Sequence, residues 1–154
     1  MSMPRAGQKA PDFKVFNDQG EMVSLSDYRG KDIVLYFYPK ADTPGCTKEA
    51  CAFRDDYSAY EKAGVTILGV SPDSVKAQAK FKEKYGLPFS LLADEDHAIS
   101  NRYGVWGLKK FMGREYEGVF RTTFLIDKEG MIREVFEKVK PAEHSQEILA
   151  ALGK

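Results

Sequence analysis

Two short and largely apolar runs, residues 33–38 and residues 65–70, dominate the hydrophobic pattern of this sequence. Apolar residues at successive positions are typical of a strand that is covered on both faces in a parallel sheet. Parallel strands need a long crossover, and residues 43–62 between the runs are rich in Ala, Glu, Lys and Tyr. Gly64, just after this segment, is a typical helix stop. The pattern predicts a right-handed β-α-β unit, and therefore an α/β fold.

The N-terminal part of the chain has the pattern of a β-hairpin. Residues 13–16 and 21–24 flank the sequence Asn-Asp-Gln-Gly at 17–20, which favours a turn between two short strands. Ser26 is predicted to cap a short helical turn that ends at Gly30.

The rest of the chain alternates between helical and extended patterns. A helix is expected to begin at Asp73 or Ser74 and to stop at Gly86, and residues 105–114 fit neither period and are interpreted as an ordered loop. The other predicted elements are strands over 89–93, 122–127 and 131–139 and helices over 96–103 and 143–152. No repeat or linker divides the 154 residues, so we predict one domain over 1–154, with a central mixed β-sheet flanked by helices.

The charge balance limits the classes of partner. Lys and Arg total 23, and Asp and Glu also total 23. A balanced chain has no field that attracts nucleic acid or an anionic membrane, so neither is expected as a partner. Residues 1–9 lack the apolar core of a secretory signal, and the run 33–38 is too short to cross a bilayer. We therefore expect a cytoplasmic location.

Cys46 and Cys51 are the only cysteines in the chain, and they follow the first apolar run. Cys46 falls in the first turn of the predicted helix, where unpaired N–H groups and the helix dipole favour the thiolate. It also lies beyond the carboxyl end of a central strand, where open α/β sheets place their sites. A close cysteine pair in a reducing cytosol is typical of a catalytic or metal-binding site.

The spacing of the two cysteines constrains how they can react. Five residues along an ideal helix separate two Cα atoms by about 8 to 9 Å. A disulfide requires Cα atoms within about 7 Å. If Cys46 and Cys51 react with each other, the first turns of the helix must unwind, and oxidation is then coupled to local unfolding.

Other interpretations of these residues remain open on pattern alone. The cysteines can be a pair of small buried hydrophobic residues. A zinc site would need His97 and His144 as well, but these lie in distant segments and the cysteine gap is at or beyond the usual range. We therefore expect no metal site, and we expect both histidines to lie at the surface.

A longer pattern around Cys46 resembles a known family. The spacing Pro39-x-x-x-Thr43-x-x-Cys46 resembles the active-site signature of peroxiredoxins, which are thiol peroxidases with a thioredoxin-like fold. The string Tyr-Phe-Tyr-Pro-Lys-Ala-Asp-Thr-Pro-Gly-Cys-Thr at 36–47, with a second cysteine at 51, is similar to the peroxiredoxin Q group, also called bacterioferritin comigratory protein. Further matching runs lie at 94–97, 103–107 and 121–127, so the resemblance covers nearly the whole chain.

The resemblance implies a role for the first cysteine and for four further residues. Cys46 would be the peroxidatic cysteine, whose thiolate attacks a peroxide oxygen and becomes a sulfenic acid. Arg121 would favour the thiolate and polarise the peroxide. Thr43 would offer its hydroxyl to the sulfur or to the peroxide, and Pro39 would shield the thiolate from water. Glu49 would support the site by tying the loop to the arginine.

The resemblance also implies how the cycle is completed. Cys51 would be the resolving cysteine, forming an intramolecular disulfide with the sulfenic acid, and thioredoxin or a similar dithiol would reduce that disulfide. The implied substrates are hydrogen peroxide and organic hydroperoxides, the implied state is a monomer without cofactor or metal, and the implied role is antioxidant defence and cell redox homeostasis.

Two other functions and one structural alternative are kept beside this hypothesis. A thioredoxin-like disulfide reductase fits the fold, but such proteins carry a Cys-x-x-Cys pattern that this chain lacks. A redox sensor or chaperone-like binding protein would use the helix unwinding as a signal. Trp106, Phe111 and Met112 either line an apolar collar for alkyl hydroperoxides or pack within their loop, and we expect packing.

Overall fold

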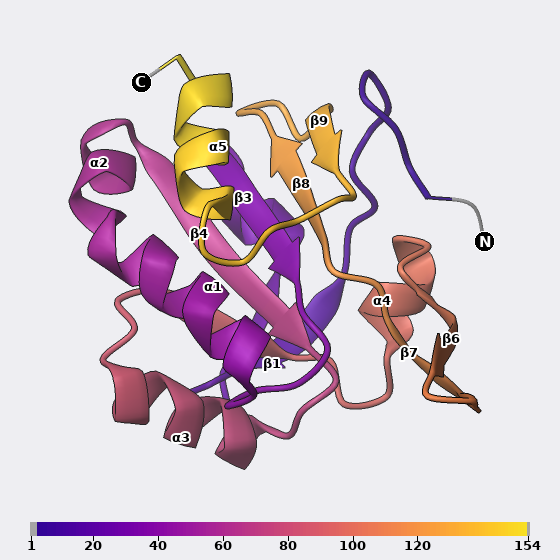
Figure 1. The fold of residues 1–154 in the computed structure, drawn as a ribbon. Coiled ribbons are helices and arrows are strands. Elements are labelled where there is room, and N and C mark those ends of the chain that lie inside the picture. Colours follow the sequence, from indigo (N-terminus) through magenta and orange to yellow (C-terminus); the bar gives the residue numbers. More distant parts are fainter. Residues whose placement is uncertain (1–2, 154) are drawn as a thin grey trace.

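The computed structural model describes residues 3–153 and consists of a seven-stranded sheet, a separate two-stranded sheet and surrounding helices (Figure 1). The strands are β1 (Lys14–Asn17), β2 (Met22–Ser24), β3 (Asp32–Phe37), β4 (Val65–Ser71), β5 (Ser90–Ala93), β6 (Trp106–Phe111), β7 (Arg114–Val119), β8 (Thr122–Ile126) and β9 (Ile132–Phe136). The helices are α1 (Pro44–Asp55), α2 (Tyr57–Lys62), α3 (Val75–Tyr85), α4 (Ala98–Arg102), α5 (His144–Ala151) and the 3-10 helix η1 (Leu25–Tyr28). None of these helices has the length and apolarity needed to cross a bilayer.

The large sheet has the strand order β2-β1-β5-β4-β3-β8-β9. Strands β3 and β4 are parallel and are joined through α1 and α2, which confirms the predicted β-α-β unit. Strand β8 runs antiparallel to β3, and the predicted hairpins β1–β2 and β8–β9 are both present. The predicted mixed α/β architecture with an N-terminal hairpin is confirmed. The predicted domain range also includes residues 1, 2 and 154, which lie outside the described part of the chain.

Alternating side chains of β3 enter two hydrophobic cores, one on each face of the sheet. Ile33, Leu35 and Phe37 pack with α4, the segment before β1 and the inner end of the β6–β7 hairpin. Val34 and Tyr36 pack on the other face, which α1, α2, α3 and α5 cover. Figure 1 shows α1, α2 and α5 in front of β3 and β4. The apolar run was continuous in the sequence because both faces of this strand are buried.

The predicted helix over 43–62 is interrupted at Asp56. α1 ends at Asp55, α2 begins at Tyr57, and Asp56 between them has φ −96° and ψ 6°. Its carboxylate accepts hydrogen bonds from Ser145 Oγ at 2.8 Å and Gln146 Nε2 at 2.9 Å, both on α5. The break therefore aligns a carboxylate with a helix that lies far away in sequence, and helix periodicity alone does not reveal it.

The predicted cap at Ser26 is wrong, whereas the predicted start and stop of α3 are confirmed. Ser24 precedes η1, and its backbone N–H donates to Asp27 Oδ2 at 2.8 Å, so Ser26 lies inside the helix. Ser74 Oγ accepts from the Ala77 N–H at 3.1 Å, and Gly86 ends α3 with a left-handed φ of 60°.

The predicted loop over 105–114 is also wrong, because most of it forms strand β6, which pairs with β7. Phe111 pairs with Arg114 across a turn of two residues. Met112 and Gly113 have φ values of 51° and 79°, as a type I′ hairpin turn requires. A Met-Gly pair gives a weaker turn signal than Asn-Gly, since methionine rarely adopts a left-handed conformation.

The expected packing of the three apolar residues in this segment holds for one of them. Trp106 is partly buried against the core and stacks on His97 with ring centroids 4.0 Å apart. Phe111 is 65% exposed and Met112 is 86% exposed, so both lie in solvent at the hairpin tip.

Candidate active site

Cys46 is the third residue of α1 and lies just beyond the carboxyl end of β3. Thr43 occupies the N-cap position and Pro44 is the first helical residue, where a missing N–H costs nothing. The Cys46 side chain is only 2% exposed, and both cysteines are free thiols. The sulfur therefore lies in a desolvated position at the positive end of a helix, which favours a charged thiolate only if a cation accompanies it.

Arg121 provides that cation. It immediately precedes β8, and Thr122 pairs with Phe37, so the antiparallel arrangement brings the start of β8 to the end of β3. Arg121 Nη2 donates to Cys46 Sγ at 3.3 Å. Arg121 Nη1 contacts Glu49 Oε1 at 2.7 Å. Two residues from successive turns of α1 therefore meet the guanidinium of a residue more distant in sequence.

The Glu49 carboxyl lies on the next turn of α1 and is fully buried. Desolvation raises the pKa of Glu49 to about 7, although the Arg121 charge and hydrogen bond act in the opposite direction. Its Oε2 atom has no hydrogen-bond partner, and the Tyr36 hydroxyl is the other buried side-chain oxygen of residues 3–153 without one. The site thus combines one permanent cation with an incompletely satisfied carboxyl group.

Thr43 and Pro39 lie on the loop that leads from β3 to α1. Thr43 Oγ1 donates to the Lys40 carbonyl at 2.8 Å and makes no side-chain cap hydrogen bond. Because the Thr43 hydroxyl proton is already used in the bond to Lys40, the oxygen retains lone pairs that can accept a hydrogen bond from a peroxide. Pro39 is partly buried and follows directly after the apolar run.

Two neighbouring residues of the same loop are fastened to α3 and the turn before it. The Ala41 N–H donates to Asp73 Oδ2 at 2.8 Å. Asp42 accepts from Lys84 Nζ at 2.8 Å and from the Tyr85 hydroxyl at 2.7 Å. Asp42 has a left-handed φ of 59°, and these contacts hold it in that uncommon conformation.

Cys51 lies on the same unbroken helix as Cys46 and is partly exposed. Because α1 runs continuously from Pro44 to Asp55, ideal geometry separates the two Cα atoms by about 8 to 9 Å. A disulfide between them therefore requires the helix to unwind, as the spacing predicts.

Sequence reasoning assigned no role to three residues that border the site. Gly45 leaves room for the guanidinium, because a Cβ atom there would lie 3.1 Å from Arg121 Nη2 and 3.8 Å from Pro141 Cγ. Lys109 of β6 is half-buried, and desolvation, followed by the Arg121 charge, lowers its pKa. Tyr36 is the third. The glycine inside the active-site motif was a detectable signal, whereas Lys109 and Tyr36 carry none.

The expectation that both histidines lie at the surface is wrong for His144. This residue is buried, with Nε2 2.7 Å from Thr123 Oγ1 and Nδ1 2.8 Å from Glu147 Oε1. Burial lowers the pKa of His144, so the imidazole is neutral near pH 7. The contact with β8 is long-range, which explains why the sequence pattern missed it. Within the described residues, no three His, Cys, Asp or Glu side chains are grouped as a metal site would require.

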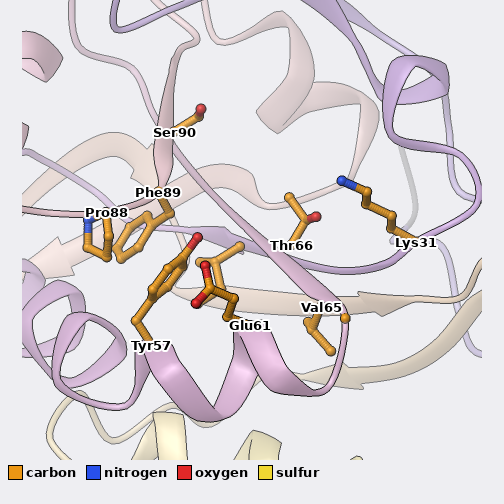
Figure 2. A pocket seen from close by; sticks show the side chains of 10 residues that line it. Lys31, Tyr57, Glu61, Val65, Thr66, Pro88, Phe89 and Ser90 are labelled. Atoms are coloured by element: carbon orange, nitrogen blue, oxygen red, sulfur yellow. The ribbon is translucent and has the colours of Figure 1, made fainter.

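Figure 2 shows the residues around a pocket of about 300 Å³. The pocket lies where β4 begins, whereas Cys46 follows the end of the parallel strand β3. It is lined by residues at the starts of β4 and β5, including Val65 and Ser90, and by Tyr57 and Glu61 of α2. Neither cysteine borders it. The reactive groups are therefore concentrated at the carboxyl end of β3.

Comparison with known proteins agrees with this geometry. The AhpC/TSA family model matches residues 6–135. A putative peroxiredoxin bcp of Coxiella burnetii is 56% identical over 95% of this chain and 97% of its own length. Peroxiredoxin Bcp of Bacillus subtilis is 54% identical over 95% of this chain and 93% of its own.

Solved structures give the same result at the level of the fold. Peroxiredoxin Q of Xanthomonas campestris has a TM-score of 0.88 and 37% identity, and the match covers 96% of each chain. The bacterioferritin comigratory protein of the same organism, studied for alkyl peroxide reduction, has a TM-score of 0.89 and 37% identity over 96% of this chain and 97% of its own. These matches confirm the thioredoxin-like fold. The chain belongs to the AhpC/TSA family and is a peroxiredoxin, an enzyme that uses a cysteine thiol to reduce peroxides.

Proposed function

We propose that Cys46 is the peroxidatic cysteine and Cys51 the resolving cysteine of this enzyme. The contact between Arg121 Nη2 and the buried Cys46 sulfur, at 3.3 Å, is the observation that carries the assignment. In the first step the thiolate attacks the terminal oxygen of ROOH, the O–O bond breaks, and Cys46 becomes a sulfenic acid while RO⁻ leaves. Arg121 stabilises the charge as it moves from sulfur to oxygen.

In the second step the Cys51 thiol condenses with the sulfenic acid, giving a disulfide and water after the start of α1 unwinds. A dithiol reductant, which we propose to be thioredoxin, then attacks this disulfide and leaves both cysteines reduced. The partly exposed position of Cys51 supports this assignment, because an incoming thiolate needs access to a sulfur atom.

The substrates we propose are hydrogen peroxide and organic hydroperoxides. The likeness to a Xanthomonas campestris protein studied for alkyl peroxide reduction supports the organic class. Thr43 accepts a hydrogen bond from the peroxide, since its own proton is held by the Lys40 carbonyl. Pro39 shields the thiolate, and Glu49 holds Arg121 in place.

The proposed setting is a single-domain monomer in the cytoplasm, where it contributes to antioxidant defence. Both cysteines are free thiols, and the cycle returns them to that state only where a dithiol reductant is present.

Substitution of the two cysteines tests the assignment directly. Cys46→Ser should abolish peroxide reduction, because serine supplies no thiolate. Cys51→Ser should permit one rapid oxidation and then stall with thioredoxin as the reductant. Peroxide consumption in single-turnover and steady-state assays measures both. A Cys46→Ser protein that consumed peroxide at the wild-type rate would exclude Cys46 as the peroxidatic residue.

The role of Arg121 is tested by Arg121→Ala. The loss of one preorganised charge at the reacting atoms should slow the first step by about 100-fold. Arg114→Ala, on the exposed β7 strand, is the matched control and should leave the rate unchanged. Competition kinetics against a reference thiol peroxidase measure the difference.

A further inference from the structure

Cys46 and Glu49 contact the same guanidinium, so the buried site places two acidic groups around one cation. Arg121 Nη2 lies 3.3 Å from Cys46 Sγ, and Nη1 lies 2.7 Å from Glu49 Oε1. Both acidic side chains are buried, and the Arg121 side chain is 20% exposed. If both ionised together, two buried negative charges would share the one guanidinium that contacts them, which is strongly unfavourable.

The other titratable groups around this site do not supply a second cation to Glu49. Lys109 of β6 donates a hydrogen bond from Nζ to the Val119 carbonyl at 2.9 Å, and its positive charge acts on Cys46, which favours the thiolate and leaves Glu49 without a second cation. His144 of α5 is neutral near pH 7, because burial lowers its pKa. Burial also raises the pKa of Tyr36 on β3 and of Tyr38 just after this strand, so both phenols stay neutral. Among the described residues, Arg121 is therefore the cation that acts on Glu49, and it is already engaged by the Cys46 sulfur.

The environment of the carboxyl group indicates where a proton resides. Glu49 Oε2 has no partner, although an ionised carboxylate needs donors at both of its oxygens. A neutral carboxyl group carries a smaller penalty when one oxygen is unsatisfied in the interior. Burial, opposed by Arg121, raises the pKa of Glu49 to about 7, which agrees with a proton held near neutrality.

We propose that Cys46 and Glu49 share one proton, which lies on Glu49 when the Cys46 thiolate is formed and passes to the leaving oxygen when the peroxide is cleaved. The inference rests on the proposed function of Cys46. Before the reaction the site holds a thiolate, a neutral carboxyl group and ROOH. Afterwards it holds a sulfenic acid, a carboxylate and ROH. Sulfur loses two electrons to the O–O bond, and the carboxyl proton converts RO⁻ into ROH.

The shared proton has a consequence that a purely structural role for Glu49 does not have. With the proton stored in the site, cleavage of the peroxide takes up almost none from solvent. Without a titratable group at position 49, the leaving oxygen must take its proton from solvent. The proton count of one turnover therefore reports whether Glu49 is the donor.

The experiment uses the Cys51→Ser protein, so that the reaction stops at the sulfenic acid. One equivalent of hydrogen peroxide is added at about pH 6, below the Glu49 pKa of about 7, in weak buffer with a pH indicator. Glu49→Gln should take up about one more proton per Cys46 oxidised than the parent, since glutamine keeps the shape and donates no acid proton. Glu61→Gln, at an exposed position on α2, should match the parent. Equal uptake by the parent and Glu49→Gln would overturn the proposal.

Two further measurements keep the test decisive. Mass spectrometry identifies the oxidised residue, and absence of oxygen at Cys46 would refute the proposed function itself, whereas oxidation of Cys46 with equal proton uptake refutes only the shared proton. If Glu49→Gln does not fold, the uptake by the parent is followed as the pH is raised. It should increase toward one proton as alkali removes the Glu49 proton before the reaction, and an uptake independent of pH would contradict the inference.

Discussion

Helix α1 and the β6–β7 hairpin both border the active site, but they are stabilised in different ways. Along α1, Glu49, Ala50 and Phe53 are fully buried and contact other elements. At the hairpin tip, Phe111 and Met112 are largely exposed, and the strands are held by their own backbone pairing. The buried region depends on contacts that are distant in sequence, whereas the hairpin depends on local register. A substitution should therefore be costly in α1 and mild in the hairpin.

The largest difference in free energy of unfolding is expected between the alanine variants of two phenylalanines. Phe53→Ala should lower the free energy of unfolding by about 3 to 5 kcal/mol, because it removes a ring that packs on Tyr36, with centroids 4.8 Å apart, and on Tyr60 at 5.8 Å. Phe111→Ala should change it by less than about 0.5 kcal/mol. Urea denaturation measures both, and similar losses would contradict the comparison.

The next contrast is between two glutamates and depends on pH. The pKa of Glu49 is raised from 4.5 to about 7 in the folded protein, so its neutral form stabilises the fold at low pH and this contribution is lost as the pH rises through 7. Glu49→Gln does not titrate. It should gain stability relative to wild type between pH 4.5 and pH 8, by at most about 3 kcal/mol.

The control for this series is Glu115→Gln in the hairpin. Glu115 is exposed and pairs with Lys110 at 3.6 Å. The difference in free energy of unfolding between Glu115→Gln and wild type should therefore stay nearly constant over the same pH range. His144 titrates in all three proteins and its contribution cancels. A pH-independent difference for Glu49→Gln would show that Glu49 is ionised throughout.

Substitution of two glycines should give a smaller difference, in the rate of the peroxide step. Gly45→Ala places a Cβ atom 3.1 Å from Arg121 Nη2, so the guanidinium must shift by a few tenths of an ångström. The peroxide step should slow by about five-fold, while stability changes by less than about 1 kcal/mol. Gly107→Ala meets the exposed Phe120 ring at 2.8 Å, which can turn away, so the rate should not change. Stopped-flow oxidation compares the two variants.

The smallest effect is expected at the hairpin turn. Met112 has a left-handed φ of 51° and makes up the first half of a turn that favours asparagine. Met112→Asn should raise the free energy of unfolding by about 0.5 kcal/mol without changing the peroxide rate. Thermal unfolding detects this gain, and a loss of stability would indicate that the Met112 side chain makes stabilising contacts in solution.

The same contrast explains which parts of the molecule were predictable from sequence. Strands β3 and β4 were predicted because a strand that is buried on both faces consists mainly of consecutive apolar residues. The limits of α3 were predicted because Ser74 and Gly86 are local signals. The break at Asp56 and the buried position of His144 depend on contacts with distant elements. The hydrophobic periodicity of the sequence therefore indicates neither of them.

The candidate site was predictable through its motif and only partly through physics. A thiol at the start of a helix follows from Cys46 and the elements around it. The meeting of Arg121 with Glu49 requires knowing that β8 lies antiparallel to β3, which no local pattern provides. Lys109 was missed because its strand was interpreted as a loop.

Ala41 and Asp42 are hydrogen-bonded to Asp73 and Lys84. These contacts would limit how far the unwinding that disulfide formation requires can extend toward β3. If the turn that carries Cys46 unwinds as proposed, the contacts of Ala41 and Asp42 would hold the chain before residue 43 in place and limit how far the sulfur can move. A short connection to an anchored segment would confine the Cys46 sulfur to a small volume. Its effective concentration near Cys51 would therefore be high. After reduction, the same contacts would favour refolding of the first turn of α1, because the residues before it would already be in place.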